Sequence, residues 1–210
     1  MNKDTVRPQS EIAHCNGIDQ LVDGLGYFHP ISCGVIEYMQ EYTIPRTVRN
    51  KELLLKAGAV CKYIYFIKKG ILRGFIKQGN KEVTTWITAE NELVTAIPSL
   101  NKQCTSKEYI QAMEDCELLA LSYEDLEVLY KEFPEFNITV RKLLQKYYED
   151  AEGRAFVVRL TKAEDRYNYF LDKYPHLAHR VPLKYIASFL GVAQETLSRV
   201  RKKALRKRKT

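Results

Sequence analysis

Long apolar runs are absent from the sequence. No stretch of its 210 residues approaches the roughly 20 consecutive apolar residues that a membrane-spanning helix needs. The first residues, MNKDTVRPQSEIAHCNG, also lack the apolar segment of a secretion signal. These absences predict a cytoplasmic protein that has no membrane partner.

Cysteine is too sparse and too scattered for a disulfide framework. The chain has five cysteines, an odd number, and no C-x-x-C pair. An odd count at wide spacing favours reduced thiols in a cytoplasm. One thiol could act as a reactive sensor, which depends on its exposure and its pKa. The five are Cys15, Cys33, Cys61, Cys104 and Cys116.

Signatures of common enzymes are missing as well. The sequence contains no P-loop, no G-x-S-x-G and no H-E-x-x-H, and G-L-G at 24–26 lacks the third glycine of a dinucleotide-binding loop. Asp172, His176 and His179 could approach one another as metal ligands. Three candidates without fixed geometry are more often linker surface. We therefore predict a protein that is not an enzyme and holds no cofactor or metal.

What the sequence does contain is a core-forming share of apolar residues, 45%, and an uneven distribution of charge. Residues 161–210 hold 13 Lys and Arg against 4 Asp and Glu, a net charge of +9. Residues 1–160 hold the other 20 and 22, a net charge of −2. A basic C-terminal part on a nearly neutral body favours a module that binds a polyanion, with a solvated charged face as the alternative.

Residues 51–121 have the pattern of β-structure. KYIYFIKKG at 62–70 is rich in β-branched and aromatic residues and ends at a glycine. ILRGFIK and EVTTWIT flank a Gly-Asn turn at 79–80, which is a hairpin signal. Two further short apolar runs follow at 109–113 and 116–122. Short strands at this spacing predict a sandwich or a jelly-roll barrel.

A helical pattern follows. Ser122 and Asp125 indicate the start of a helix that ends before Pro134, and a long helix is predicted at 137–160. At roughly 1.5 Å per residue the long helix would measure about 36 Å, more than a small barrel needs for cover. Its apolar stripe could pack on the barrel or pair with a second chain, and we favour a homodimer. The stripe is Val140, Leu144, Tyr147, Ala151 and Val158, interrupted by Arg154.

A new helix is predicted after the long one, because Thr161 to Glu164 form a capping box, and it should run to about Lys173. The sequence is thereby divided into N-terminal helices with a β-roll at 1–136, a dimerisation helix at 137–160 and a C-terminal module at 161–210.

The C-terminal module contains a helix-turn-helix pattern in VPLKYIASFLGVAQETLSRVRKKAL, residues 181–205. A first helix spans 183–190, and Gly191 can take the positive φ of a sharp turn. An ordinary helical hairpin is the alternative. Every constrained position of the motif has a suitable residue, namely Ile186, Ala187, Leu190, Gly191, Val192, Leu197 and Val200.

The outer face of the second helix is polar. Arginine can bind guanine through two hydrogen bonds, glutamate can accept one from cytosine, and glutamine can pair with adenine. Glu195 lies four residues before Arg199 and could also hold it in place. Base contacts are predicted for Gln194, Glu195, Ser198 and Arg199, and phosphate contacts for Thr196, Lys202, Lys203 and Lys184.

These features together resemble the Crp/Fnr family of bacterial transcription regulators. The likeness rests on the long helix, the helix that begins near Thr161 and IASFLGVAQETLSRVRK. LLLKAGAVCKYIYFIKKGILRGFIKQGNKEVTTWIT is similar to the cyclic-nucleotide-binding β-roll of that family. The resemblance covers nearly all of residues 20–205. It implies an α+β chain with a β-roll (jelly roll), a long dimerisation helix and a winged-helix-like helix-turn-helix domain.

The resemblance also implies partners and base contacts. The partners are a second copy of the chain, a two-fold symmetric double-stranded DNA operator and RNA polymerase. Glu195, Ser198 and Arg199 match the E-x-x-S-R pattern of the oxygen-sensing branch. Gln194 stands where the cyclic-AMP branch has an arginine, so the base read there should differ.

The nucleotide-binding residues of the family are not retained. Its phosphate-binding arginine has no counterpart, since Lys107 lacks bidentate geometry, and Glu152 adds an unfavourable negative charge. The iron–sulfur branch needs a close cysteine cluster, which Cys15 and Cys33 do not form. We expect a degenerate pocket and an unknown small-molecule effector. The positions that the resemblance assigns to it are Thr95, Ala96, Ser106, Lys107, Ala151 and Glu152.

The end of the sequence departs from the family as well. Many members follow the recognition helix with a β-hairpin wing, whereas this sequence continues as RKKALRKRKT, and we expect the basic tail to take over backbone contacts. The alternative function is a receptor for a cyclic nucleotide or another small ligand that acts through protein contacts.

Overall fold

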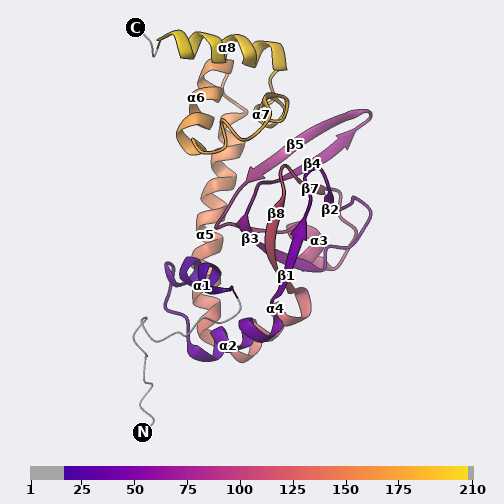
Figure 1. The fold of residues 1–210 in the computed structure, drawn as a ribbon, viewed down its shortest axis with the longest axis vertical. Helices are drawn as coiled ribbons and strands as arrows, with labels where there is room; N and C mark the ends of the chain where they lie inside the picture. Colours follow the sequence, from indigo (N-terminus) through magenta and orange to yellow (C-terminus); the bar gives the residue numbers. More distant parts are fainter. Residues whose placement is uncertain (1–16, 208–210) are drawn as a thin grey trace.

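The computed structural model describes residues 17–207, the last three of them as backbone only (Figure 1). Two helices come first, strands fill the middle of the chain, and helices follow to the end. The helices are α1 (Asp19–Gly26), α2 (Cys33–Tyr42), α3 (Ile97–Lys102), α4 (Tyr123–Glu132), α5 (Pro134–Val157), α6 (Ala163–Lys173), α7 (Leu183–Leu190) and α8 (Gln194–Lys207). The strands are β1 (Ile44–Val48), β2 (Leu53–Leu55), β3 (Tyr63–Lys69), β4 (Leu72–Gln78), β5 (Lys81–Thr88), β6 (Leu93–Val94), β7 (Tyr109–Ala112) and β8 (Cys116–Ser122).

The strands of the described residues form two antiparallel sheets, in the orders β1-β8-β3-β6 and β2-β7-β4-β5. Apolar side chains from both sheets, among them Tyr65, Leu72 and Ile110, are buried between them. The predicted hairpin is confirmed: Gln78 pairs with Lys81, and Gly79 takes the positive φ of the turn, +58°. The structure therefore has the predicted α+β organisation with an antiparallel β-roll.

Helices α1, α2 and α4 pack at one end of the roll, where they share a core with the first turns of α5. The predicted start of α4 is confirmed, because the Ser122 hydroxyl accepts a hydrogen bond from the Asp125 amide at 3.0 Å. Helix α5 begins at Pro134 rather than at 137 and ends at Val157 rather than at 160. Proline is tolerated at the first helical position, since the amide it lacks would have no helical partner there.

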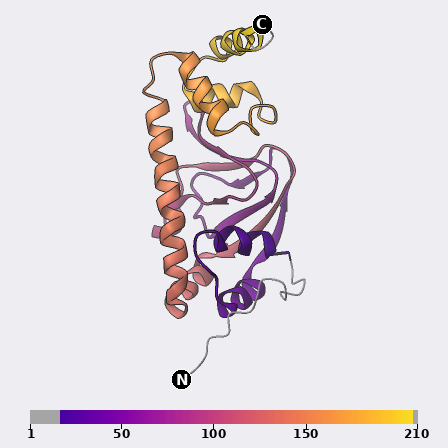
Figure 2. The same ribbon diagram turned by 90° about the vertical axis from the view of Figure 1, so that its left-hand side faces the viewer.

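Helix α5 runs along one side of the roll (Figure 2). It carries apolar residues on both its buried and its exposed side. The predicted stripe is partly wrong. Tyr147 lies against the roll, where its hydroxyl accepts a hydrogen bond from the Leu93 amide at 2.9 Å, and Val140 packs on the same core. The exposed side instead carries Leu144, Tyr148 and Val158. A sequence stripe cannot distinguish these two sides, because both repeat with helical spacing.

The last three helices pack as a unit on the roll. Their core includes Phe170, Ile186 and Leu197, together with Ile71 and Ile87 of the roll. The predicted capping box is wrong: Lys162 precedes α6 and makes no side-chain cap. In a capping box Thr161 would be the residue directly before the helix, but Lys162 occupies that position.

The predicted basic tail is largely helical. Helix α8 extends to Lys207, while Arg208 and Lys209 lie outside the described residues. From α4 to Lys207 the chain contains no strand, so the winged-helix likeness is limited to its helices. None of the described helices combines the length and the apolar character needed to cross a membrane.

Candidate functional site

The turn between α7 and α8 has the geometry that the sequence predicts. Gly191 adopts φ +63° after the last residue of α7, and the Val192 amide donates to the carbonyl of Ala187 at 3.0 Å. The apolar motif positions face inward: Ile186, Ala187, Leu190 and Leu197 are buried, and Val192 and Val200 are partly buried. The two helices are therefore held in a fixed relation by a shared apolar core.

Arg166 on α6 holds this turn, and sequence reasoning missed it. Its Nε donates to the Leu160 carbonyl at 2.7 Å, and its Nη1 donates to the carbonyls of Leu190 and Gly191 at 2.9 and 3.1 Å. A cation at the C-terminal end of α7 is also favoured by the helix dipole. Backbone carbonyls carry no residue-specific signal, so the sequence does not indicate this role.

The outer face of α8 is open to solvent. Gln194, Glu195 and Arg199 are exposed, and Ser198 is half-buried. The predicted support of Arg199 by Glu195 is wrong in this structure: Arg199 donates instead to the Thr196 hydroxyl, at 3.4 Å. That contact is long, so the guanidinium remains available to an external acceptor.

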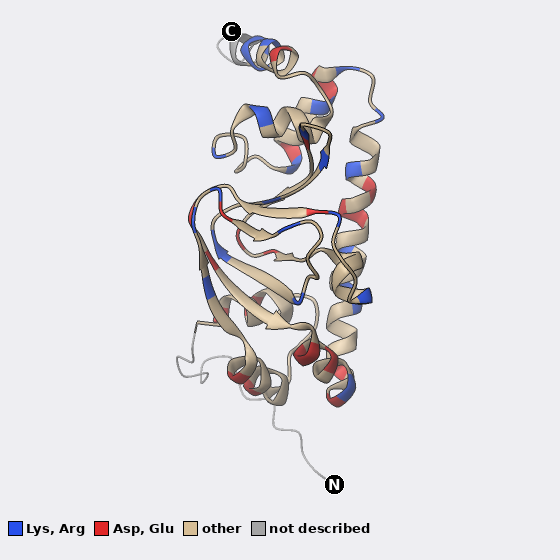
Figure 3. Cartoon of the chain, turned by 90° about the vertical axis from the view of Figure 1, so that its right-hand side faces the viewer, with Lys and Arg blue, Asp and Glu red and all other residues tan. Residues whose placement is uncertain are grey.

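Lysine and arginine positions are concentrated along α8, at the end of the molecule far from α2 (Figure 3). Lys202 is exposed. Lys203 is exposed but donates to Glu164 Oε2 on α6 at 2.9 Å, so a phosphate would have to displace that carboxylate. Lys184 on α7 lies 4.5 Å from the ring centre of Tyr185. The predicted phosphate contacts thus come from both helices of the motif.

The positions assigned to a nucleotide pocket do not form one site. The Thr95 hydroxyl donates to the Tyr63 carbonyl at 3.1 Å, and Ser106 exchanges two 3.0 Å hydrogen bonds with the backbone of Glu108. Ala96 is buried at the start of α3, whereas Lys107 is exposed. The hydroxyl groups are therefore already used locally, and Lys107, the cation among the assigned positions, is exposed to solvent.

A cavity of about 600 Å³ does lie between the roll and α5. Of the assigned positions, Thr95 and Ala151 line it, while Ala96, Ser106, Lys107 and Glu152 do not. Its walls are mainly apolar and aromatic, and the indole of Trp86 lies so close to Gly74 that a side chain there would collide with it. Trp86 is a lining residue that no sequence motif indicated.

The charge of this cavity does not suit a cyclic phosphate. Of the described residues that line it, Arg154 is the only lysine or arginine, whereas Glu92 and Asp150 are acidic and already hold Lys146 and Lys173 in ion pairs. Tyr147 also lines it, and burial raises the pKa of its phenol far above its ordinary value, so it stays protonated. The cavity fits a largely apolar ligand better than an anion.

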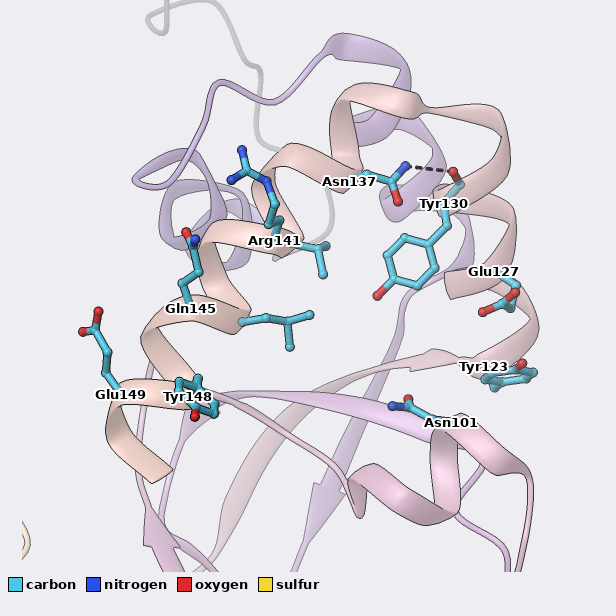
Figure 4. A pocket seen from close by; sticks show the side chains of 11 residues that line it. Asn101, Tyr123, Glu127, Tyr130, Asn137, Arg141, Gln145, Tyr148 and Glu149 are labelled. Atoms are coloured by element: carbon cyan, nitrogen blue, oxygen red, sulfur yellow. Dashed lines mark hydrogen bonds between the residues drawn. The ribbon is translucent and has the colours of Figure 1, made fainter. Parts of the chain in front are cut away.

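A second hollow lies on the exposed side of α5. This groove, about 1020 Å³, runs between α5, α4 and the end of α3 (Figure 4). Leu144 and Tyr148 line it from α5 and Tyr130 from α4. Asn137 Nδ2 donates to the Tyr130 carbonyl at 2.9 Å and joins the two helices. The groove thus borders the apolar side of α5 that the roll does not cover.

Among the described residues, no cysteine lines the cavity or the groove. In the described chain Cys33, Cys61, Cys104 and Cys116 are free thiols, and Cys15 lies outside it. Burial raises the pKa of the Cys116 thiol to about 11. Between residues 17 and 207, histidine, cysteine and acidic side chains do not gather in a group able to hold a metal ion.

Comparison with known proteins finds a family model that matches the roll. The family described as cyclic nucleotide-binding domain matches residues 45–133. A sequence search of curated proteins returned no match. The similarity extends further among solved structures, where it covers most of the chain and shows the fold.

Three of those structures illustrate the likeness. The c-di-GMP responsive global regulator CLP of Xanthomonas campestris is 21% identical, with 84% of this chain and 93% of that chain covered and a TM-score of 0.66. The catabolite activator protein of Thermus thermophilus is 23% identical, with 88% and 87% covered and a TM-score of 0.53. FixK2 of Bradyrhizobium japonicum is 15% identical, with 79% and 85% covered and a TM-score of 0.66.

Proposed function

We propose that this chain is a dimeric, sequence-specific DNA-binding transcription regulator of the Crp/Fnr type, whose β-roll keeps the cyclic-nucleotide-binding fold without its nucleotide chemistry. The observation that carries the proposal is the open outer face of α8. Glu195 and Arg199 stand exposed on a helix that is held by a buried turn and by Arg166. A helix that the protein already holds in place, with polar side chains open to solvent, is suited to insertion into a major groove of DNA.

The two kinds of side chain on α8 have separate tasks. Arg199 can donate two hydrogen bonds to guanine, and Glu195 can accept one from cytosine. Lys202, Lys203 and Lys184 neutralise phosphates, which supplies affinity but no sequence preference. Gln194, Ser198 and Thr196 complete the predicted contact set. Lys203 would exchange its partner Glu164 for a phosphate on binding.

A second copy would cover the exposed side of α5. Leu144 is 55% exposed, Tyr148 68% and Val158 44%. With Ala151 they recur at intervals of four, three and seven residues, the spacing of a coiled-coil seam. Exposed apolar surface of this kind is typical of an interface. Two α5 helices packed about a two-fold axis would place the recognition helices about 34 Å apart, one turn of B-DNA.

The effector of such a regulator would differ from a cyclic nucleotide. The cavity beside α5 has acidic Glu92 and Asp150 against the single basic Arg154, and its other walls are mainly apolar. RNA polymerase is the expected further partner of a regulator bound at an operator.

Selection of bound sequences from a random double-stranded DNA pool tests the function. A recovered palindrome with half-site centres about 10 base pairs apart is the expected result. Recovery of no preferred sequence, at salt low enough for binding, would contradict the base-reading role. It would favour the alternative of a ligand receptor that acts through protein contacts.

A further inference from the structure

Arg73 is an unusually placed arginine, because only 1% of its surface is exposed. It projects from β4, and its guanidinium pairs with Glu82. Its Nε and Nη2 donate to Gln111 Oε1 at 3.0 and 2.7 Å, and its Nη1 donates to the Thr84 hydroxyl at 3.4 Å. These partners all belong to the roll, so they orient the guanidinium as part of the sheet.

The cover over this guanidinium comes from another domain. Arg73 lies between two aromatic rings, 4.1 Å from the centre of Phe75 and 4.0 Å from that of Tyr185. Phe75 is its neighbour on β4, whereas Tyr185 is on α7, the first helix of the helix-turn-helix. A planar guanidinium suits such stacking, which a lysine cannot reproduce. The stack can form only while the helix-turn-helix domain is docked on the roll.

A second contact joins α7 to the edge strand β5. The Ser188 hydroxyl donates to the Glu82 carbonyl at 3.1 Å and accepts from the Thr84 amide at 2.9 Å. Strand β5 is the last strand of its sheet, so these backbone groups have no neighbouring strand. Glu82 thus meets α7 through its carbonyl and Arg73 through its carboxylate.

A third contact precedes α7. Arg180 donates to both carboxylate oxygens of Glu90 at 2.9 and 2.6 Å and also pairs with Glu114. Glu90 in turn accepts from the Gly70 amide at 2.8 Å. Together these contacts hold one side of the helix-turn-helix domain, while the outer face of α8 stays exposed.

We propose that Arg73 is a positioning residue for DNA recognition. With Tyr185 and Ser188 it sets the angle between the roll and the helix-turn-helix domain, and so the separation of the two recognition helices in a dimer. Without this clamp the domain keeps its apolar core with Ile71 and Ile87 and the ion pairs of Arg180, but α7 is no longer fixed on β4 and β5. The inference rests on the proposed function, because it assumes a dimer that binds two half-sites.

The clamp has a specific thermodynamic effect. A single domain reads its half-site through α8 whether or not it is docked. A palindrome also requires the second domain to be at the right distance after the first has bound, which depends on the effective concentration of that domain. Substitutions that remove the contact between Arg73 and Tyr185 should therefore weaken binding to the full palindrome and leave binding to an isolated half-site unchanged.

The test compares Arg73→Lys and Tyr185→Ala with two controls. Tyr185→Phe keeps the ring, and Lys77→Ala removes a cation of the same strand that lies 5.1 Å from the Tyr109 ring and does not reach α7. Affinities are measured for the selected palindrome and for one half-site. Arg73→Lys and Tyr185→Ala should lose at least about tenfold on the palindrome and change less than about twofold on the half-site, and the controls should match the wild type.

Hydrogen exchange in the DNA-free protein provides a second measurement. Exchange at the Thr84 amide, which donates to Ser188, should accelerate in Arg73→Lys and not in Lys77→Ala. The positioning role would be overturned by unchanged exchange at the Thr84 amide or by unchanged or tighter binding to the palindrome. An equal loss of affinity for the palindrome and the half-site would overturn it as well. Failure of the wild type to prefer any DNA sequence would instead refute the proposed function. The sequence preference of the wild type is therefore measured before that of any variant.

Discussion

Replacing Arg199 by alanine is the sharpest test of base reading by α8. The side chain is exposed, and among the described residues its one hydrogen bond is the 3.4 Å contact to Thr196. Its removal should therefore change the free energy of unfolding by less than about 0.5 kcal/mol. Any large effect on DNA binding then reports the contact with DNA rather than damage to the fold.

The expected effect follows from the number of recognition helices. A bidentate contact to a base contributes about 1–3 kcal/mol of discrimination, so two helices in a dimer contribute about 2–6 kcal/mol. Affinity for the selected palindrome should fall by at least about 30-fold. Affinity for scrambled DNA should fall only as far as the removal of one positive charge per chain requires.

Lys202→Ala is the matched control, because it removes one exposed charge from the same helix. It should weaken palindrome and scrambled DNA alike and reduce the slope of log affinity against log salt by about 0.9 for each phosphate that is no longer neutralised. Gel-shift titrations of both variants at several salt concentrations provide the comparison. If Arg199→Ala weakens both DNAs equally, α8 is only a cationic surface and the base-reading assignment is wrong.

Three further predictions concern the dimer, the effector and pH. Leu144→Glu should produce monomers that bind the palindrome poorly. The control Asn168→Glu, which also introduces a glutamate but on the exposed surface of α6, should remain dimeric. A dimer mass retained by Leu144→Glu in light scattering would place the interface elsewhere. Cyclic AMP should not bind in calorimetry, because the Thr95 and Ser106 hydroxyls donate to backbone carbonyls and Ser106 does not line the cavity. A micromolar dissociation constant would overturn the degenerate-pocket assignment. The hydrogen bond from Arg180 lowers the pKa of Glu90 from 4.5 to about 2, so the carboxylate stabilises the folded state above about pH 4.5 and loses that contribution as the pH falls towards 2. Urea unfolding from pH 6 to pH 2 should show a smaller fall in stability for Glu90→Gln than for the wild type, and parallel curves would exclude this ion pair as a source of acid sensitivity.

Much of the fold follows from short stretches of sequence. The turn at 79–80, the cap at Ser122 and the turn at Gly191 each depend on a few consecutive residues, and all three appear as predicted. The apolar core between α7 and α8 could also be predicted, because its apolar positions repeat with helical spacing over 181–205. The start of α5 was missed by three residues because proline can begin a helix as well as end one.

Site residues that depend on the third dimension were not predictable in this way. The sequence placed Tyr147 in the stripe for which pairing with a second chain was favoured, but Tyr147 lies against the roll and Tyr148 is exposed. Arg199 and Glu195 have the spacing of an ion pair, yet the arginine rotamer reaches Thr196. The nucleotide positions were placed by resemblance, and only the structure shows that Thr95 and Ala151 reach a cavity that Ser106 and Lys107 do not.

The sequence by itself determined the α+β elements, the helices α7 and α8 with the turn between them, and the charge of α8, because these features depend on propensity, periodicity and composition along the chain. The tertiary structure alone decided the covering of Arg73 by Tyr185, the bridge between Ser188 and Thr84, and the hold of Arg166 on the turn. Ser188 and Thr84 are 104 residues apart, and Arg166 and Leu190 are 24 apart. Contacts of that kind arise only when packing brings distant segments together and excludes water from their polar groups, which a local sequence pattern does not encode.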